Sequence, residues 1–302
     1  MRRINFIGSV FGWGAQASST SLGPVFMNKE YNIVEKLSQA SIPSYWYASV
    51  QNTMYDLNLT PKGKNYNAVV YHSSSLYHAI QKCITEYPKE IPFIIGGDHS
   101  CAIGTWLGVV DKLDAHDNFG LIWIDAHMDA HTHETSPSKL YHGMPLSVLL
   151  GYGDKTLQSI GGTYIDQRRI NPELLVLIGV RSYEPEEENW LKSFGVKIIK
   201  IAEVRKKGLR QVFQEALELV TKATKGFGIS MDLDAIDPSD APGVNSPELY
   251  GILWEEMAEH LPLILNRPEL KAIEIAEFDP TIDYNNRTAE IILQIALKLG
   301  NM

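Results

Sequence analysis

Short apolar runs that end in histidine or aspartate constrain this chain more than any other feature. Residues 93–95, 121–124 and 227–230 are largely apolar and β-branched, and each run is followed by a segment with carboxylate or imidazole groups. Such runs are typical of buried strands in a parallel sheet. The ligand crevice of an open α/β sheet lies outside the carboxyl ends of its strands. We therefore expect the polar residues after the three runs to meet at one edge of a sheet.

Segments with strand and helix patterns alternate along the whole chain. Helical spacing of apolar residues predicts helices over residues 28–39, 74–86 and 208–221, and Thr288 is expected to cap a last helix. This alternation predicts a doubly wound α/β fold with helices on both faces of the sheet. The segments with the apolar character of strands are Ile4–Ile7, Ala68–Tyr71, Phe93–Ile95, Leu121–Ile124, Leu174–Ile178, Lys197–Ile201, Gly226–Met231 and Ala272–Ile275.

Three long polar segments are expected to form loops. They cover residues 8–23, which are rich in glycine and serine, and residues 130–141 and 151–171. Long loops in compact domains are often functional, and the loop after residue 129 is placed to form a substrate wall. The sequence contains no internal repeat, low-complexity tract or interdomain linker, so residues 1–302 are expected to form a single domain.

Charge and composition exclude some classes of partner. The formal net charge is -9, which gives no electrostatic support for nucleic-acid binding. No stretch approaches the roughly 18 apolar residues that a transmembrane helix requires, so no membrane partner is expected. The two cysteines, Cys83 and Cys101, have no metal-binding spacing and form no disulfide framework. They favour a reducing compartment, and we expect the protein to be cytoplasmic.

Histidines and aspartates follow the three strand-like runs at spacings that suit metal binding. In an extended segment, alternation places Asp125, His127 and Asp129 on one side. Burying such groups together without counter-charge would be costly, because like charges repel and lose their hydration. Six ligands of mixed type exceed the needs of one tetrahedral ion and suit two metal ions. The six candidates are His99, Asp125, His127, Asp129, Asp232 and Asp234.

Taken singly, two of these segments have ordinary structural interpretations. His99 alone would be a capping or core histidine, and Asp232 with Asp234 alone would cap a helix or form a turn. The three ionisable groups of residues 125–129 are harder to explain by packing, so the segments together indicate a metal site. Carboxylates with some imidazole and no thiolate suit Mn²⁺ better than Zn²⁺, Co²⁺, Fe²⁺ or Ni²⁺. Two such ions lower the pKa of a shared water, which predicts hydrolysis of an electrophilic carbon or phosphorus centre.

The ordered set of motifs resembles the ureohydrolases, the family of arginases and agmatinases. The resemblance covers nearly the whole chain and is strongest to bacterial arginases, through the segments at 134–138, 142–146 and 178–184. It implies a three-layer α/β/α sandwich on a mostly parallel eight-stranded sheet, and homotrimers or homohexamers. The motifs that carry it are Gly-Gly-Asp-His-Ser at 96–100, Asp-Ala-His-Met-Asp at 125–129, Met-Asp-Leu-Asp-Ala-Ile-Asp-Pro at 231–238, Ala-Pro-Gly at 241–243, and Glu277.

The resemblance also implies two Mn²⁺ ions per subunit. Asp125 and Asp232 would bridge the ions. His99 and Asp129 would complete the shell of one ion, and His127 and Asp234 that of the other.

Three residues would take part in the chemistry by resemblance. Asp129 would handle a proton of the attacking hydroxide, and His142 would protonate the leaving amine. Glu277 would pair with the substrate guanidinium through a charge-assisted contact. Judged without the family, His142 is a loop histidine before Gly143, and Glu277 is a solvated or helix-capping glutamate.

The residues expected to bind the rest of the substrate are His131, Ser138, Glu184 and Ser246. Glu184 matches a position that binds the α-amino group of arginine; its alternative interpretation is a surface acid in the run 184–188. Arginases have asparagine at the positions of His131 and Leu140. His131 can still donate a hydrogen bond to a carboxylate, whereas the side chain of Leu140 cannot.

These changes, and Asn-Ser-Pro at 245–247 in place of Gly-Thr-Pro, fall in the substrate wall rather than among the metal ligands. Lys139 could supply compensating positive charge. Three interpretations follow. The first is an arginase that makes L-ornithine and urea from L-arginine. The second is a relative that acts on agmatine or another guanidino compound. The third is a non-catalytic metal-binding or assembly protein, which the complete set of site residues argues against.

Overall fold

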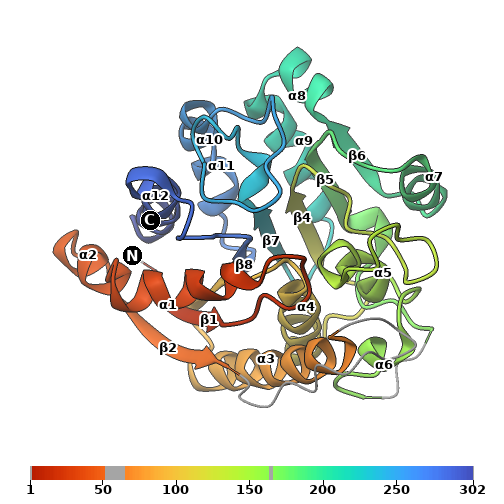
Figure 1. Cartoon of the computed structure of the whole chain (residues 1–302), viewed down its shortest axis with the longest axis horizontal. Coiled ribbons are helices and arrows are strands. Elements are labelled where there is room, and N and C mark those ends of the chain that lie inside the picture. Colours follow the sequence, from red (N-terminus) through yellow and green to blue (C-terminus); the bar gives the residue numbers. More distant parts are fainter. Residues whose placement is uncertain (1, 52–64, 163–165, 302) are drawn as a thin grey trace.

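Eight parallel strands form one sheet at the centre of the molecule (Figure 1). The computed structural model describes residues 2–51, 65–162 and 166–301. The strand order is β2-β1-β3-β8-β7-β4-β5-β6, and every strand pair is parallel. The strands are β1 (Ile4–Ser9), β2 (Ser44–Val50), β3 (Ile91–Ile95), β4 (Gly120–Ile124), β5 (Leu175–Val180), β6 (Lys197–Lys200), β7 (Phe227–Asp232) and β8 (Leu270–Ala276).

Helices cover both faces of the sheet. In the described residues the α-helices are α1 (Leu22–Lys29), α2 (Ile33–Gln39), α3 (Tyr66–Glu86), α4 (Cys101–Lys112), α5 (Pro145–Leu149), α6 (Lys155–Gln158), α7 (Pro185–Ser193), α8 (Ile201–Lys207), α9 (Leu209–Val220), α10 (Trp254–His260), α11 (Pro262–Leu265) and α12 (Arg287–Gly300). The short 3-10 helices are η1 (Ser18–Ser21), η2 (Tyr141–Gly143), η3 (Pro172–Leu174), η4 (Leu233–Ala235) and η5 (Tyr284–Asn286). No helix of the described part is long and apolar enough to cross a membrane.

Two hydrophobic cores separate the three layers. In β4, Ile122 and Ile124 pack into the core under α1, α2 and α8 to α12, whereas Leu121 and Trp123 pack into the core under α3 to α7. Both sides are apolar because helices cover both faces, which explains why the strand reads as a continuous apolar run. The predicted three-layer α/β/α sandwich on an eight-stranded sheet is confirmed.

Close packing explains the glycine inside β7. A Cβ atom built on Gly228 would lie 2.1 Å from a ring atom of Trp106 in α4. The Trp106 side chain is fully buried, so the indole packs directly on the backbone of the strand. Any larger residue at this position would displace α4 from the sheet.

One predicted strand is wrong, and one strand of the sheet was not predicted. Ala68–Tyr71 is part of the helix α3, and the edge strand is Ser44–Val50 instead. A short apolar run does not distinguish a strand from a helix segment, and here Tyr71 is 62% exposed while Ala68 and Val69 face the core. β2 escaped detection because its side chains are mostly half-buried, with no clear apolar alternation.

Other boundaries differ in detail. The predicted helix over residues 28–39 is split into α1 and α2 around Asn32, which has a left-handed φ of 51°. The predicted loop over residues 8–23 contains η1 and the first residues of α1. The predicted loop over 151–171 contains α6, and its residues 163–165 lie outside the described part of the chain.

The strands that carry the polar motifs are neighbours. β3, β8, β7 and β4 are consecutive in the sheet, and their carboxyl ends point to the same edge. The segments after them therefore converge in space although they lie up to about 180 residues apart in sequence.

Candidate active site and metal centre

Three carboxylates surround one nitrogen of His99 at the carboxyl edge of the sheet. His99 Nδ1 lies 3.2 Å from Asp125 Oδ2, 3.0 Å from Asp129 Oδ2 and 3.2 Å from Asp232 Oδ2. All four side chains are buried, and Nδ1 has no hydrogen-bond partner among the described residues. An imidazole nitrogen directed at several carboxylate oxygens is the arrangement of a metal-ligand set.

A second group shares Asp125 with the first. His127 Nδ1 lies 3.6 Å from Asp125 Oδ1 and 2.9 Å from Asp234 Oδ2. The two oxygens of Asp125 thus serve different groups. Asp232 belongs to the first group of potential ligands only, and its Oδ1 accepts the backbone N–H of Asp234 at 2.9 Å.

The electrostatics of this cluster call for positive charge. Burial and the neighbouring Asp125 raise the pKa of Asp129 to about 7. Burial and the neighbouring carboxylates also raise the pKa of Asp232 well above its ordinary value. Burial would raise the pKa of Asp125 too, but the adjacent His127 and His99 hold it below its usual range. Buried oxygens with this much mutual repulsion fit a pair of divalent cations, which would replace the protons.

Buried polar residues orient the metal-ligand candidates. His99 Nε2 lies 3.0 Å from Ser230 Oγ, which donates to Glu274 Oε1 at 2.8 Å. The His99 ring stacks on Trp123 at a centroid distance of 4.3 Å, and Trp123 Nε1 donates to Asp125 Oδ2 at 2.9 Å. These contacts fix the direction of His99 Nδ1 and of the Asp125 carboxylate. Ser230, Glu274 and Trp123 were not among the predicted site residues; polar side chains inside apolar strand runs were the available signal.

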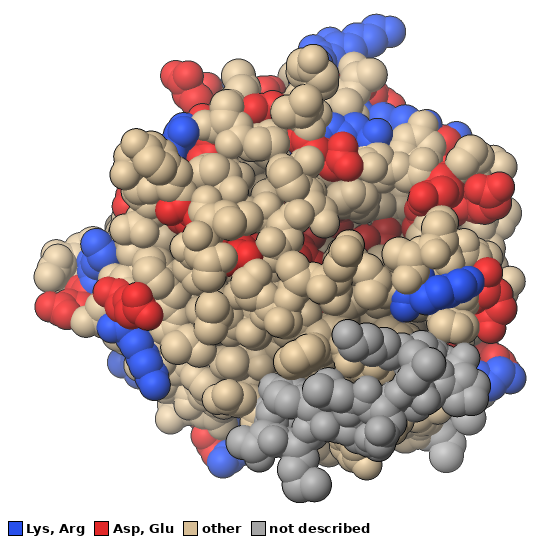
Figure 2. All heavy atoms as spheres, viewed as in Figure 1, with Lys and Arg blue, Asp and Glu red and all other residues tan. Residues whose placement is uncertain are grey.

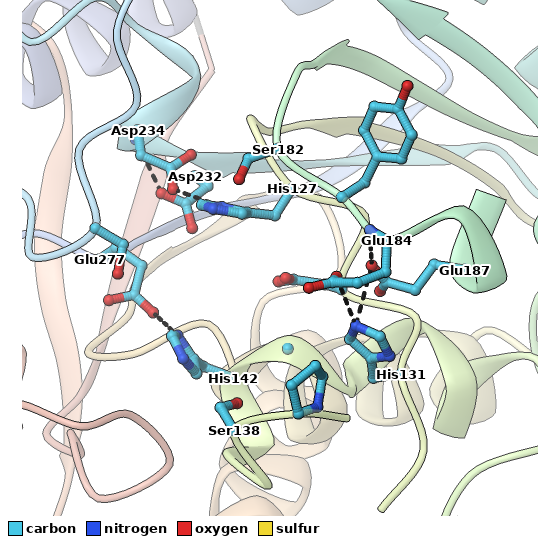
Figure 3. Close-up of a pocket in the computed structure, with 15 residues that line it drawn as sticks. His127, His131, Ser138, His142, Ser182, Glu184, Glu187, Asp232, Asp234 and Glu277 are labelled. Atoms are coloured by element: carbon cyan, nitrogen blue, oxygen red, sulfur yellow. Dashed lines mark hydrogen bonds and ion pairs between the residues drawn. The ribbon is translucent and has the colours of Figure 1, made fainter. Parts of the chain in front are cut away.

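A cavity of about 280 Å³ opens above the two groups of ligands. Figure 2 shows acidic side chains recessed at the centre of this face. Every predicted catalytic and substrate-binding residue lines the cavity, as do His127, Asp232 and Asp234 (Figure 3). His99 and Asp125 lie beneath its floor, where no solvent reaches Asp125. The seven predicted catalytic and substrate-binding residues are Asp129, His131, Ser138, His142, Glu184, Ser246 and Glu277.

An ion pair stands on one wall of this cavity. His142 Nδ1 lies 3.2 Å from Glu277 Oε1, and the same oxygen accepts the backbone N–H of His99 at 2.8 Å (Figure 3). Burial lowers the pKa of His142, but the pairing with Glu277 outweighs it and raises this pKa to about 9. Glu277 itself adopts a left-handed φ of 66°, and its backbone N–H donates to the carbonyl of Gly97 at 2.8 Å.

Comparison with known proteins places this arrangement in a family. A family model described as "Arginase family" matches residues 2–300 of this chain. The chain belongs to the arginase family. It is 32% identical to the arginase of Bacillus subtilis (strain 168) over 298 residues, which cover 99% of this chain and 97% of that one. It is also 32% identical over 308 residues to the arginase of Bacillus caldovelox, with 98% and 97% covered.

Solved structures agree with this membership. The structure of the Bacillus caldovelox arginase has a TM-score of 0.89 at 32% identity and covers 100% of this chain and 99% of that one. The structure of the Bacillus subtilis arginase has a TM-score of 0.87 at 31% identity, with the same coverage. As a member of the arginase family, the protein is a hydrolase of the C–N bonds of amidines, and a purely structural role is set aside.

The outer wall of the cavity is where this arginase-family chain departs from the predicted contacts. His131 Nε2 lies 2.9 Å from Glu184 Oε2 and 3.2 Å from Glu187 Oε2, and its Nδ1 lies 3.1 Å from Thr135 Oγ1. Burial lowers the pKa of His131, but Glu187 and Glu184 raise it above its ordinary value. Both ring nitrogens are therefore engaged, and His131 neutralises glutamates rather than offering a free N–H to the cavity.

Glu187 holds this wall together. It accepts the backbone N–H of Ala130 at 3.0 Å, and it forms a capping box with Glu184 at the start of α7. Glu187 is buried, whereas the Glu184 side chain is 47% exposed and reaches into the cavity. Glu187 was not predicted as a site residue. Its signal was the pairing of glutamates three residues apart before a helix, which is the spacing of a capping box.

Lys139 does not face the cavity. Its Nζ donates to the backbone carbonyls of His133 at 2.7 Å and Glu134 at 3.3 Å, so the ammonium group braces its own loop. Ser138 does line the cavity, and its hydroxyl lies 3.3 Å from that of Ser136. The sequence suggested that Lys139 supplies positive charge for the substrate, but its ammonium group is bonded to its own loop.

Proposed function

We propose that this protein is a binuclear manganese arginase that hydrolyses L-arginine to L-ornithine and urea. The observation that carries the proposal is the pair of buried ligand groups that share Asp125 at the floor of a cavity whose wall holds the His142–Glu277 pair. Membership of the arginase family and the two bacterial arginase relatives support it.

The donor set fits two Mn²⁺ ions per subunit. His99, Asp125, Asp129 and Asp232 would hold one ion, and Asp125, His127, Asp232 and Asp234 the other. The chemistry that these ions supply when bound is a hydroxide nucleophile at neutral pH.

The chain's own residues would then bind the guanidinium and move protons. Glu277 pairs with the guanidinium group, which places the central carbon above the floor of the cavity. Asp129 takes a proton from the attacking hydroxide as a C–O bond forms. His142 delivers a proton to the nitrogen of the C–N bond that breaks, so that L-ornithine leaves as an amine.

The outer wall would hold the amino-acid end of the substrate. Glu184 is half-exposed at the cavity rim and would accept the α-ammonium group. Ser138 and Ser246 offer hydroxyl donors to the α-carboxylate. His131 would act on this end of the substrate through the charge of Glu184.

A second candidate is an agmatinase or another guanidino-compound ureohydrolase. Its supporting observation is the lack of a free cationic side chain: among the described residues of the cavity wall no Lys or Arg occurs, and both nitrogens of His131 are engaged. A substrate without an α-carboxylate, such as agmatine, would not need such a cation.

We also propose a cytoplasmic homotrimer or homohexamer with one domain over residues 1–302. The two cysteines are free and buried, which is compatible with a reducing compartment.

The deciding experiment measures urea release from the Mn²⁺-loaded protein with L-arginine and agmatine in parallel, beside an Asp232→Asn variant. Release of urea from L-arginine by the wild-type protein, with none released by the variant, supports the arginase proposal. Urea from agmatine alone supports the second candidate. No urea from either compound, at full manganese content, contradicts both.

A further inference from the structure

Gly14 lies in the loop after β1, and its backbone contacts residues from two different site segments. Its N–H donates to Asp98 Oδ2 at 2.8 Å, and its carbonyl accepts the backbone N–H of His142 at 3.2 Å. Asp98 is fully buried, and its other oxygen, Oδ1, accepts the backbone N–H of Ser100 at 2.9 Å. The backbone of this one residue thus connects the loop after β3 to the loop that carries His142.

These contacts close a ring around one side of the cavity. From Asp98 the ring runs through Gly14 to His142, from the His142 ring to Glu277 at 3.2 Å, and from Glu277 Oε1 to the N–H of His99 at 2.8 Å. His99 is the chain neighbour of Asp98. His142 is therefore held at its backbone by Gly14 and at its ring by Glu277.

The space around Gly14 admits no side chain. A Cβ atom there would lie 2.5 Å from Ser100 Oγ and 2.6 Å from Asp98 Oδ1. The carbonyl of the preceding residue, Trp13, accepts the side-chain N–H of Asn65 at 3.0 Å, which fixes the loop from its other side. The contact between Gly14 and Asp98 therefore depends on the missing Cβ.

We propose that Gly14 is a positioning residue that sets the place of the His142 imidazole relative to Glu277 and the cavity floor. The role of His142 in proton delivery rests on the proposed function; the ring of contacts does not. Displacing Gly14 moves the backbone of residue 142, and a shift of about 1 Å in a catalytic group costs on the order of 100-fold in rate.

The test is a double-mutant cycle on the manganese-loaded full chain, with the guanidine that the wild-type protein hydrolyses. Gly14→Ala is expected to lower kcat by about 10- to 100-fold, with KM and manganese content within about two-fold of wild type. In a His142→Ala background the same change is expected to alter kcat by less than about two-fold, because its effect passes through His142. Effects that multiply in the double variant overturn the proposal.

Gly12→Ala is the matched control for distortion of the loop. Its Cβ would lie 2.4 Å from the carbonyl oxygen of Ser18, and its three nearest atoms all belong to the backbone of Ser18. We expect it to lower Tm while kcat stays within about two-fold of wild type. A loss of kcat equal to that of Gly14→Ala would overturn the proposal. Should Gly14→Ala fail to fold, Asp98→Asn replaces it in the double-mutant cycle with His142→Ala, because it removes one acceptor oxygen from the residue that bonds Gly14.

A readout without turnover separates this inference from the proposed function. Diethyl pyrocarbonate labels accessible imidazole, and peptide mass mapping gives the rate at His142. We expect labelling at His142 to be several-fold faster in Gly14→Ala than in wild type, and unchanged in Gly12→Ala. Equal rates in all three proteins would refute the positioning role, whereas faster labelling in a protein that releases no urea would refute only the proposed function.

Discussion

Asp125 presents its two carboxylate oxygens to two different histidines. Oδ2 lies 3.2 Å from His99 Nδ1, and Oδ1 lies 3.6 Å from His127 Nδ1. Trp123 Nε1 and the backbone N–H of His127 also donate to this carboxylate, at 2.9 and 2.6 Å. It is the one residue common to the two groups of metal-ligand candidates found around the cavity floor in the described part of the chain.

Replacing Asp125 should therefore affect both ions at once. We expect Asp125→Ala to abolish turnover and to leave much less than one manganese per subunit. Asp232→Ala, which removes the other proposed shared ligand, is expected to abolish turnover and to lower the manganese content as well. Elemental analysis after gel filtration, with urea release, tests this. Asp166→Asn, an exposed acid paired with Lys155, serves as the control and should keep both metal and activity. Full manganese content in Asp125→Ala would refute the shared-ligand assignment.

The convergence of the metal-ligand candidates was predictable because its signal is local. A buried strand followed at once by carboxylates occurs at β4 and β7, and parallel strands bring such ends together whatever their separation in sequence. The same reasoning failed at residues 68–71, where a four-residue apolar run belongs to α3. Edge strand β2 gave no signal, since its mostly half-buried face needs no apolar alternation.

Contacts between distant side chains were not predictable. Nothing near His131 in sequence indicates that Glu187 would occupy its Nε2, and nothing near Gly14 indicates a bond to His142. Lys139 shows the same limit: its charge suggested a role in binding substrate, but the nearest acceptors are carbonyls of its own loop. The family resemblance indicates which positions belong to the site, but only the structure shows which of their hydrogen-bond donors are already bonded to other groups of the chain.

The His142–Glu277 pair predicts a pH-dependent contribution to stability. The pKa of His142 rises to about 9 in the folded chain, from an unfolded value of about 6.5. A raised pKa means that the stabilisation is fully present below about pH 6.5 and is lost as pH rises through about 9. Its upper limit is about 3 kcal/mol.

Urea-induced unfolding of the metal-free protein at pH 6, 7.5 and 9.5 measures this contribution. The free energy of unfolding of wild type minus that of His142→Asn should be largest at pH 6 and near zero at pH 9.5. A difference that grows with pH would contradict the assignment of the ion pair.

Packing of α4 on the sheet gives a prediction about stability alone. Gly228→Ala places a methyl carbon 2.1 Å from a ring atom of the fully buried Trp106. We expect a loss of at least about 1–3 kcal/mol in the free energy of unfolding, as for other overpacked cores. The measurement is the midpoint of thermal or urea unfolding. A change below about 0.5 kcal/mol would show that α4 and the sheet separate more easily than this contact implies.

We expect His131 to determine how strongly the outer wall of the cavity binds the end of the substrate that lies away from the guanidinium group. Its imidazolium now neutralises Glu184 and Glu187 and leaves no N–H directed at the cavity. In His131→Asn that positive charge is lost, so Glu184 gains attraction for an ammonium group, while the amide supplies a donor for a carboxylate.

The distal end of L-arginine carries both groups, whereas that of agmatine carries an ammonium group and no carboxylate. We therefore expect His131→Asn to lower KM for L-arginine about five-fold more than KM for agmatine, the value of one hydrogen bond of about 1 kcal/mol, because only L-arginine offers a carboxylate to the new amide. Lys139→Ala is the control, because Lys139 is bonded to its own loop, and it should leave both KM values unchanged. If KM for L-arginine rises in His131→Asn, the imidazolium itself contacts the substrate carboxylate, and its bonds to the two glutamates must then exchange when substrate binds.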